Sequence, residues 1–470
     1  MESLEYDLVV IGSGPAGEKG AAQAAYFGKR VALVEKASVP GGAAANTGTL
    51  PSKTLRETAL YLTSFRQRGL HGVTLTVGDR VTARDFLFHQ QHVTETEQAR
   101  IDQNLARHKV DRYHGFASFT DPHTISVAQE NAPAILLKGD FFLIATGSRP
   151  HRPANFPFND PRVFDSDTIL GIRDIPRSML VSGGGVIGCE YACLFSALGV
   201  KVTLVEGRDR LLGFLDFEIS DALTASMAKM GIDLLLNDSI ESVEASGSLS
   251  VKLKSGKTIQ VDTLLAASGR SGNTAGMNLE AIGIQPSPRG QLEVNSHYQT
   301  AVPHIYAAGD VIGFPALAST SMEQARVAMV HAFDLKYKTS VAHILPYGIY
   351  TIPECSAVGE TEETLRQKKI PYVAGRARYS QNARGQIVGD RDGFLKLLFR
   401  ADDMKLLGVG VIGEQASELV HVGLTALLAE STAELFIQMC FNYPTLSEMY
   451  KYATYDALGQ RAALGHRLMP

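Results

Sequence analysis

One pattern occurs twice in this chain and restricts its fold more than any other feature of the sequence. In the first copy, an apolar run at 6–11 is followed by a glycine turn at 12–17, an alanine-rich stretch at 18–27 and a second apolar run at 30–35. The second copy repeats this order from residue 178 onward. An apolar strand, a glycine turn, a helix and another apolar strand make the βαβ unit of a parallel sheet. The duplication therefore predicts an α/β protein with two Rossmann-like units.

Each copy also carries residues that suit a dinucleotide. The glycines of such a turn let the backbone approach a pyrophosphate, and the N-terminus of the following helix favours its negative charge. An acidic residue that ends the second strand accepts a hydrogen bond from a ribose 2′-hydroxyl. This acid follows the last glycine by 18 residues in both copies (35 − 17 and 206 − 188). We therefore expect two dinucleotides to bind at once, at Gly12, Gly14, Gly17 and Glu35 and at Gly183, Gly185, Gly188 and Glu206.

The composition excludes several other classes of protein. The 470 residues are 45% hydrophobic, which suffices for a large core and suggests about three domains. The net charge of −4 gives no reason to expect nucleic acid or a membrane surface as a partner. No apolar run approaches the roughly 18 residues of a spanning helix. The acidic N-terminus leads directly into a predicted strand and is not a signal peptide, so we expect a cytoplasmic protein.

Two small groups of residues have both a functional and a structural interpretation. Cys189 and Cys193 lie four residues apart in a predicted helix. They could form a redox pair, but this spacing is near the limit for a disulfide, which favours two small buried side chains. His89, His92 and Glu95 lie at spacings of three on another predicted helix. A solvated helix face is favoured over a metal site there, because nothing nearby completes a set of ligands.

The segment that follows the first unit, residues 41–53, has the sequence GGAAANTGTLPSK. It resembles the redox-active segment of flavin-dependent disulfide reductases, Gly-Gly-x-Cys-x-x-x-x-Cys-x-Pro-x-Lys, with Ala44 and Thr49 in place of the two cysteines. Together with the duplicated unit, it makes the whole chain resemble the two-dinucleotide-binding flavoproteins, the pyridine nucleotide-disulfide oxidoreductases. Within that family it is most similar to members that transfer hydride between nicotinamide nucleotides, at residues 209–212, 214–216, 348–354, 383–389 and 441–445.

The resemblance implies a division of the chain. Residues 1–150 and a return segment at 271–340 would form the FAD-binding domain. Residues 151–270 would form the NAD(P)-binding domain, and 341–470 would form an α+β domain that mediates dimerisation. The implied assembly is a homodimer or a higher homo-oligomer.

The resemblance also implies site residues and cofactors. Lys53 would lie beneath flavin N5, with Glu190 as its ion-pair partner. The implied cofactors are FAD, NAD and NADP. Further contacts are implied for Thr146, Gly147 and Asp310 with FAD, and for Gly269 and Arg270 at the nucleotide site.

The departures from the family pattern change the expected chemistry. Disulfide reductases carry a His-Pro-Thr segment whose histidine handles thiol protons, and here Tyr443-Pro444-Thr445 occupies that place with Glu448 retained. Without the cysteines and the histidine no thiol relay can operate. The remaining acceptors for flavin electrons are a second nicotinamide, a quinone and O2. We expect a ping-pong transhydrogenase that uses NADPH and NAD+; an NAD(P)H-dependent quinone reductase or oxidase and a redox-inactive scaffold are the alternatives.

The nucleotide preference stays open at this point. Glu206 suits a free 2′-hydroxyl and repels a 2′-phosphate, so alone it favours NAD(H). Arg208 and Arg210 follow two and four residues later. They could bind the phosphate of NADP(H), or they could be solvated loop arginines.

Overall fold

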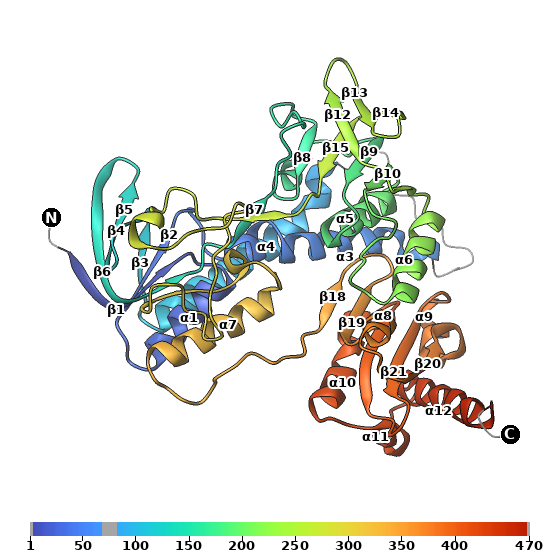
Figure 1. Ribbon diagram of the computed structural model, residues 1–470. Helices are drawn as coiled ribbons and strands as arrows, with labels where there is room; N and C mark the ends of the chain where they lie inside the picture. The colour runs from blue at the N-terminus through green and yellow to red at the C-terminus, as the bar shows by residue number, and fades with distance from the viewer. Residues whose placement is uncertain (1–2, 68–81, 468–470) are drawn as a thin grey trace.

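A seven-stranded sheet is built around the first glycine-turn unit in the computed structural model, which describes residues 3–67 and 82–467 (Figure 1). Its elements are β1 (Leu4–Ile11), α1 (Pro15–Tyr26), β2 (Val31–Glu35), α2 (Gly42–Asn46), α3 (Thr49–Gln67), α4 (Ala83–Arg107), β3 (Asp111–His114), β4 (Phe116–Asp121), β5 (Thr124–Gln129), β6 (Ala132–Ile144), the 3₁₀ turn η2 (Glu280–Ile282), β17 (Ile305–Ala307), the 3₁₀ turn η3 (Asp310–Ile312) and α7 (Ala318–Ala332). The strand order is β3-β2-β1-β6-β5-β4, and β17 pairs with β6. The apolar run of β1 is buried because β2 and β6 flank it and α1 and α7 pack nearby.

The second unit builds a five-stranded parallel sheet with the order β11-β10-β9-β15-β8, and a three-stranded antiparallel sheet lies beside it (Figure 1). Its elements are β8 (Val163–Asp165), the 3₁₀ turn η1 (Thr168–Gly171), β9 (Ser178–Ser182), α5 (Val186–Ala197), β10 (Lys201–Glu206), α6 (Phe217–Lys229), β11 (Asp233–Leu236), β12 (Ile240–Glu244), β13 (Leu249–Leu253), β14 (Thr258–Val261) and β15 (Thr263–Ala266). β7 (Ser148–Pro150) and β16 (Arg270–Gly272) pair antiparallel where the chain enters and leaves this unit.

The C-terminal region is a five-stranded antiparallel sheet with the order β18-β19-β22-β21-β20. Its elements are β18 (Tyr347–Ile349), β19 (Cys355–Gly359), α8 (Glu362–Gln367), β20 (Tyr372–Arg378), the 3₁₀ turn η4 (Tyr379–Gln381), α9 (Ala383–Val388), β21 (Phe394–Arg400), β22 (Leu406–Ile412), α10 (Ala416–Leu428), α11 (Ala433–Gln438) and α12 (Met449–Arg467). Helix α12 lies against β20 and β21, and α10 lies against β19 and β22 (Figure 1).

The predicted fold class is confirmed: two Rossmann-like units are followed by an α+β C-terminal region. Residues 111–127 are not all hairpin strands: β4 and β5 form a hairpin, whereas β3 pairs parallel with β2. The domain limits at 150, 270 and 340 stay a prediction. Within residues 3–67 and 82–467, no helix is long and apolar enough to cross a membrane.

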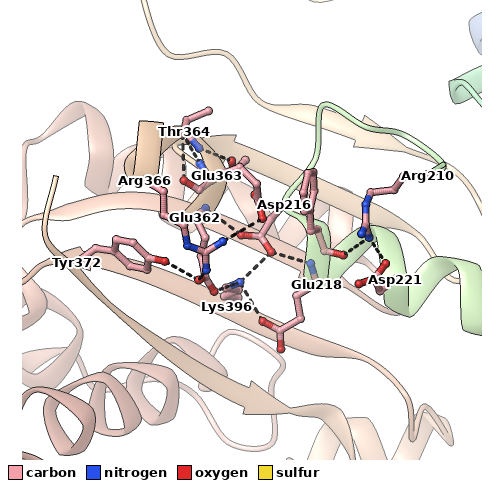
Figure 2. A network of polar contacts seen from close by, with 12 residues as sticks. Arg210, Asp216, Glu218, Asp221, Glu362, Glu363, Thr364, Arg366, Tyr372 and Lys396 are labelled. Carbon is pink, nitrogen blue, oxygen red and sulfur yellow. Dashed lines mark hydrogen bonds and ion pairs between the residues drawn. The ribbon is translucent and has the colours of Figure 1, made fainter. Parts of the chain in front are cut away.

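A buried cluster of charges joins the second unit to the C-terminal region (Figure 2). The Lys396 side chain on β21 is 2% exposed. Its Nζ lies 2.8 Å from Asp216 Oδ1, 2.9 Å from Glu218 Oε2 and 2.5 Å from Glu362 Oε1. Arg376 Nη2 lies 2.7 Å from Glu218 and 3.2 Å from Glu362. A lysine buried so deeply requires such partners, and their positions fix the start of α6 against the C-terminal sheet.

Candidate functional site

A cavity of about 830 Å³ lies where the three regions of the chain meet. The first glycine turn, the 42–53 segment and the C-terminal end of β6 form much of its wall. Many of the predicted site residues line it, namely Gly12, Gly14, Glu35, Lys53, Thr146, Gly147, Glu190, Arg270 and Asp310. Gly17 and the residues predicted for the second dinucleotide, Gly183, Gly185, Gly188, Glu206, Arg208 and Gly269, lie outside this lining.

The first glycine turn is closed by backbone contacts that exclude side chains. A Cβ on Gly17 would lie 1.8 Å from the Gly12 carbonyl oxygen, so the turn requires glycine there. Glu35 at the end of β2 accepts hydrogen bonds from Ser13 N at 2.9 Å and Ser13 Oγ at 2.6 Å. Its other oxygen accepts from Ala37 N at 2.8 Å. The carboxylate is therefore held at the edge of the cavity where a ribose hydroxyl could donate to its remaining lone pairs.

The second glycine turn repeats this construction. A Cβ on Gly188 would lie 1.8 Å from the Gly183 carbonyl oxygen, whereas one on Gly185 would meet no atom within 4 Å. The open space at Gly185 suits the close approach of a pyrophosphate to the start of α5. Glu206 Oε2 accepts a hydrogen bond from Gly184 N at 2.6 Å. The acid is thus tied to its own turn, as Glu35 is in the first unit.

The two arginines beside Glu206 occupy different positions. Arg208, whose side chain is 60% exposed, folds back so that its Nε lies 2.9 Å from Glu206 Oε1. Burial opposes ionisation of Glu206, but the hydrogen bonds from Arg208 and from Gly184 N outweigh it and keep the pKa of this carboxyl below its usual value. Arg210 instead pairs with Asp221 and stacks on Phe217 at 4.2 Å. Of these two arginines, Arg208 is the one that pairs with the Glu206 carboxylate.

Lys53 and Glu190 come together from two different units. Lys53 lies in the first turns of α3 and Glu190 on α5, and Lys53 Nζ is 2.6 Å from Glu190 Oε2. The other oxygen of Glu190 accepts from Tyr350 N at 2.9 Å. Lys53 Nζ also lies 5.1 Å from the centroid of the Tyr350 ring. This pair therefore stands in the cavity wall, held by the C-terminal region as well as by both units.

The cavity lining has no thiol at the two positions where the redox-active segment of disulfide reductases has cysteines. Ala44 and Thr49 line the wall near Lys53. Cys189, Cys193 and Cys355 are buried and free, and they lie outside the lining of the cavity. Burial raises the pKa of the Cys193 thiol to about 12, so it is not a reactive thiolate. The structural interpretation of the Cys189 and Cys193 pair is confirmed. The described residues hold no group of three side chains suited to a metal ion.

Sequence reasoning missed the residue that links Asp310 to Arg270. Ser148 Oγ donates to Asp310 Oδ2 at 2.7 Å and accepts from Arg270 Nε at 2.7 Å. Arg270 Nη2 also donates to the Ser148 carbonyl oxygen at 2.8 Å. Ser148 directly follows Thr146-Gly147, which was the only sequence signal available. These hydrogen bonds connect the paired strands β7 and β16 to Asp310, the first residue of η3, which lines the cavity.

The C-terminal region contributes residues that the sequence did not indicate. Tyr350, which directly follows β18, lines the cavity together with Ser417 and His421 of α10. Burial raises the pKa of Tyr350, so its hydroxyl stays protonated near neutral pH. Tyr443, which replaces the histidine of the family segment, is exposed and lies outside the cavity lining of its own chain.

The lining fits an FAD molecule. The Thr146 hydroxyl is buried against the cavity without a hydrogen-bond partner, which a bound polar group would supply. Gly14 lines the cavity and Ala16 begins the buried face of α1, so the helix N-terminus faces the space that a pyrophosphate would occupy. Glu35, which ends β2, and Lys53, in the first turns of α3, both line the same cavity.

Known proteins match the chain over nearly all of its length. The profile described as pyridine nucleotide-disulphide oxidoreductase matches residues 6–332, and the dimerisation domain of that family matches residues 345–454. The soluble pyridine nucleotide transhydrogenase of Mycobacterium bovis is 46% identical over 462 residues, 98% of each chain. That of Chromohalobacter salexigens is 43% identical over 466 residues, 97% of this chain and 98% of the relative.

Solved structures share the fold, and two of them illustrate the likeness. LpdA from Mycobacterium tuberculosis superposes with a TM-score of 0.88 at 26% identity, covering 96% of this chain and 99% of the other. The HOCl-induced flavoprotein disulfide reductase RclA from Escherichia coli superposes with a TM-score of 0.86 at 27% identity, covering 95% and 98%.

Proposed function

Because the chain belongs to the pyridine nucleotide-disulphide oxidoreductase family of flavin-dependent enzymes, we propose that it is an FAD-dependent transhydrogenase that passes hydride between NADPH and NAD+. The two nucleotides use one site in turn, so the kinetics are ping-pong. The relatives named soluble pyridine nucleotide transhydrogenase support this assignment. We further propose that the enzyme acts in the cytoplasm as a homodimer, or as a higher homo-oligomer of such dimers, formed through the C-terminal domain.

One observation carries the proposal: the Lys53–Glu190 ion pair is complete, while Ala44 and Thr49 stand where a disulfide would accept electrons. Bound FAD supplies N5 as the atom that accepts and returns hydride. The protein then needs only to align the nucleotide and to stabilise charge. Lys53 provides a positive charge in the cavity wall, and Glu190 holds that ammonium group in position with Tyr350 N.

The remaining predicted residues take binding roles in this proposal. Glu35 holds the adenosine ribose of FAD, and Thr146, Gly147 and Asp310 hold its middle part. The second glycine turn binds the pyrophosphate of the nicotinamide nucleotide, with Glu206 at its ribose. Gly269 and Arg270, where β16 begins and pairs with β7, lie beside that nucleotide.

The Glu206–Arg208 pair suits an enzyme that must accept both nucleotides. For NAD(H), Glu206 accepts from the 2′-hydroxyl while Arg208 stays on the carboxylate. For NADP(H), Arg208 is the cation that can turn toward the 2′-phosphate. Its exposed side chain leaves room for that turn.

Replacing Arg208 by alanine should therefore raise KM for NADPH about tenfold and leave KM for NADH nearly unchanged, since a charge-assisted contact contributes about 1.5 kcal/mol or more. Arg210→Ala is the matched control, because Arg210 is held by Asp221 and Phe217. Initial-rate kinetics with each nucleotide and a common acceptor would measure both constants. Equal changes in the two KM values would remove Arg208 from phosphate recognition.

The proposed function is tested by mixing the purified holoenzyme anaerobically with NADPH and thio-NAD+. Formation of thio-NADH at catalytic rates is the expected result. Bleaching of the flavin by NADPH without thio-NADH formation would reject transhydrogenation, and turnover with menadione or O2 would then favour the quinone reductase or oxidase. A flavin that stays yellow with either nucleotide would favour the scaffold.

A further inference from the structure

Three aromatic rings, one from each region of the chain, meet beside the cavity. Phe314 follows η3, Tyr347 begins β18 and Phe214 lies in the loop between β10 and α6. The rings of Phe314 and Tyr347 are stacked at 6.1 Å with an angle of 15° between their planes. The Phe214 ring is tilted by 54° to the Tyr347 ring, and their centroids are 5.6 Å apart. We call these three residues the aromatic wall.

The three rings of the aromatic wall do not line the cavity themselves, but chain neighbours of Tyr347 and Phe314 do. Pro346 and Gly348, on either side of Tyr347, both line the cavity, and so does Ala316, two residues after Phe314. Tyr350 directly follows β18, the strand that Tyr347 begins, and it contacts both Lys53 and Glu190. Tyr347 is therefore only three residues from the tyrosine whose ring lies near Lys53.

The loop that carries Phe214 ties the aromatic wall to the second glycine turn. This loop starts at Glu206, and Leu212 N donates to the Gly184 carbonyl oxygen at 3.1 Å. Its far end is fixed by Asp216, which caps α6 through Glu218 N and accepts from the buried Lys396. With both ends anchored, Phe214 is held between the glycine turn and the C-terminal sheet (Figure 2 shows the anchor at Asp216).

The aromatic wall joins the loop that starts at Glu206 to the segment that carries Tyr350, whose ring contacts Lys53. We therefore expect a nucleotide that binds at Glu206 and reaches Lys53 to extend toward this wall. Phe314 is 78% exposed although it stacks on Tyr347, so one face of its ring is open to solvent. Aromatic rings bind planar heterocycles by offset stacking and exclude water from them. We propose that the aromatic wall binds the nicotinamide half of the nucleotide and holds it against the cavity. This inference rests on the proposed function, since it concerns the substrate of the same site.

The aromatic wall should act differently from Arg208. NADH and NADPH share the nicotinamide half and differ only at the 2′-position of the adenosine ribose. Loss of the Phe314 ring should therefore weaken both nucleotides by the same factor, whereas loss of Arg208 discriminates between them. Because the contact is made before and during hydride transfer alike, KM should rise while kcat changes little.

The test compares Phe314→Ala and Phe314→Leu with wild-type holoenzyme. Dissociation constants for NAD+ and NADP+ are measured at fixed ionic strength from the perturbation of the flavin spectrum, together with KM and kcat. We expect Phe314→Ala to raise both dissociation constants about three- to tenfold, and Phe314→Leu, which keeps apolar bulk without a planar face, to raise them less. Tyr26→Ala is the matched control, because Tyr26 is 74% exposed on α1 and lies outside the cavity lining.

Unchanged dissociation constants in both Phe314 variants would overturn the proposal, as would a change confined to one nucleotide. If Phe314→Ala loses bound flavin or melts at a lower temperature, the dissociation constants of Phe314→Leu decide the test. Failure of the proposed function is separate: a wild-type enzyme that binds both nucleotides but forms no thio-NADH rejects transhydrogenation and still permits the binding comparison.

Discussion

Replacing Lys53 by methionine is expected to slow flavin reduction by NADPH about 100-fold. In the proposed function the ammonium group would stabilise negative charge that develops in the cavity during hydride transfer. Removing one preorganised electrostatic contact of this kind typically costs about 10²–10³ in rate. Methionine retains the length and much of the apolar stem of lysine. Stopped-flow absorbance of the flavin under anaerobic conditions measures the rate directly.

The controls separate chemistry from folding. Lys53→Met leaves Glu190 buried without its cation, so the double variant Lys53→Met/Glu190→Gln removes that unpaired charge as well. The double variant should regain melting temperature without regaining rate. Lys201→Met, at the exposed start of β10, controls for loss of a lysine elsewhere in the nucleotide unit. A reduction rate in Lys53→Met equal to that of wild type would exclude Lys53 from the reaction.

Replacing Lys396 by methionine should destabilise the protein by about 3–5 kcal/mol, because it removes the central cation from a buried cluster and leaves Asp216, Glu218 and Glu362 facing Arg376. Thermal unfolding followed by flavin fluorescence would report this loss. Lys252→Met is the matched control, since Lys252 and its partner Glu241 are both exposed at the surface and should matter little. Equal melting temperatures in the two variants would contradict the prediction.

The pH dependence follows from the same contacts. Burial opposes ionisation of Glu218, but Arg376 and Lys396 lower its pKa from 4.5 to about 2. Its contribution to stability is therefore present above about pH 4.5 and is lost as the pH falls toward 2. Burial also opposes the charge of Lys396, yet Asp216 and the other carboxylates raise its pKa above 10.5, so its contribution is present below that pH and is lost at more alkaline pH. The loss in the free energy of unfolding caused by Lys396→Met should thus be largest near neutral pH and smaller in acid.

Sequence reasoning predicted the parts of this protein that have a recognisable short motif or that match the sequence pattern of the family. The glycine turns were predictable because a Cβ on Gly17 or Gly188 would clash with the backbone carbonyl five residues earlier. The turn therefore requires glycine at a fixed spacing, which can be recognised in the sequence. The family assignment and the fold class are confirmed by the matching profiles. The roles of the individual site residues stay predictions.

What was missed has no local signature. Lys396, Asp216 and Glu362 are ordinary charged residues in the sequence, and only the packing of α6 and α8 against β21 brings them together. The same holds for the aromatic wall, whose rings lie far apart in the chain. Helix α12 was not predicted either, because it buries Tyr450, Ala453 and Ala457 on the C-terminal sheet without a strong apolar stripe.

The antiparallel pairing of β7 with β16 has a consequence for how this protein could be built or rebuilt. Pro150 and Arg270 are direct partners across that ribbon, so the chain leaves the first domain and returns to it at neighbouring points. Paired strands stand about 5 Å apart, a gap that a tight turn spans. Residues 151–269 are therefore topologically an insertion between two chain segments that contribute strands to the same seven-stranded sheet. We expect that it can be exchanged for a segment of different coenzyme preference through two junctions, which lie side by side at Pro150 and Arg270, with Asp216 and Glu218 kept to meet Lys396.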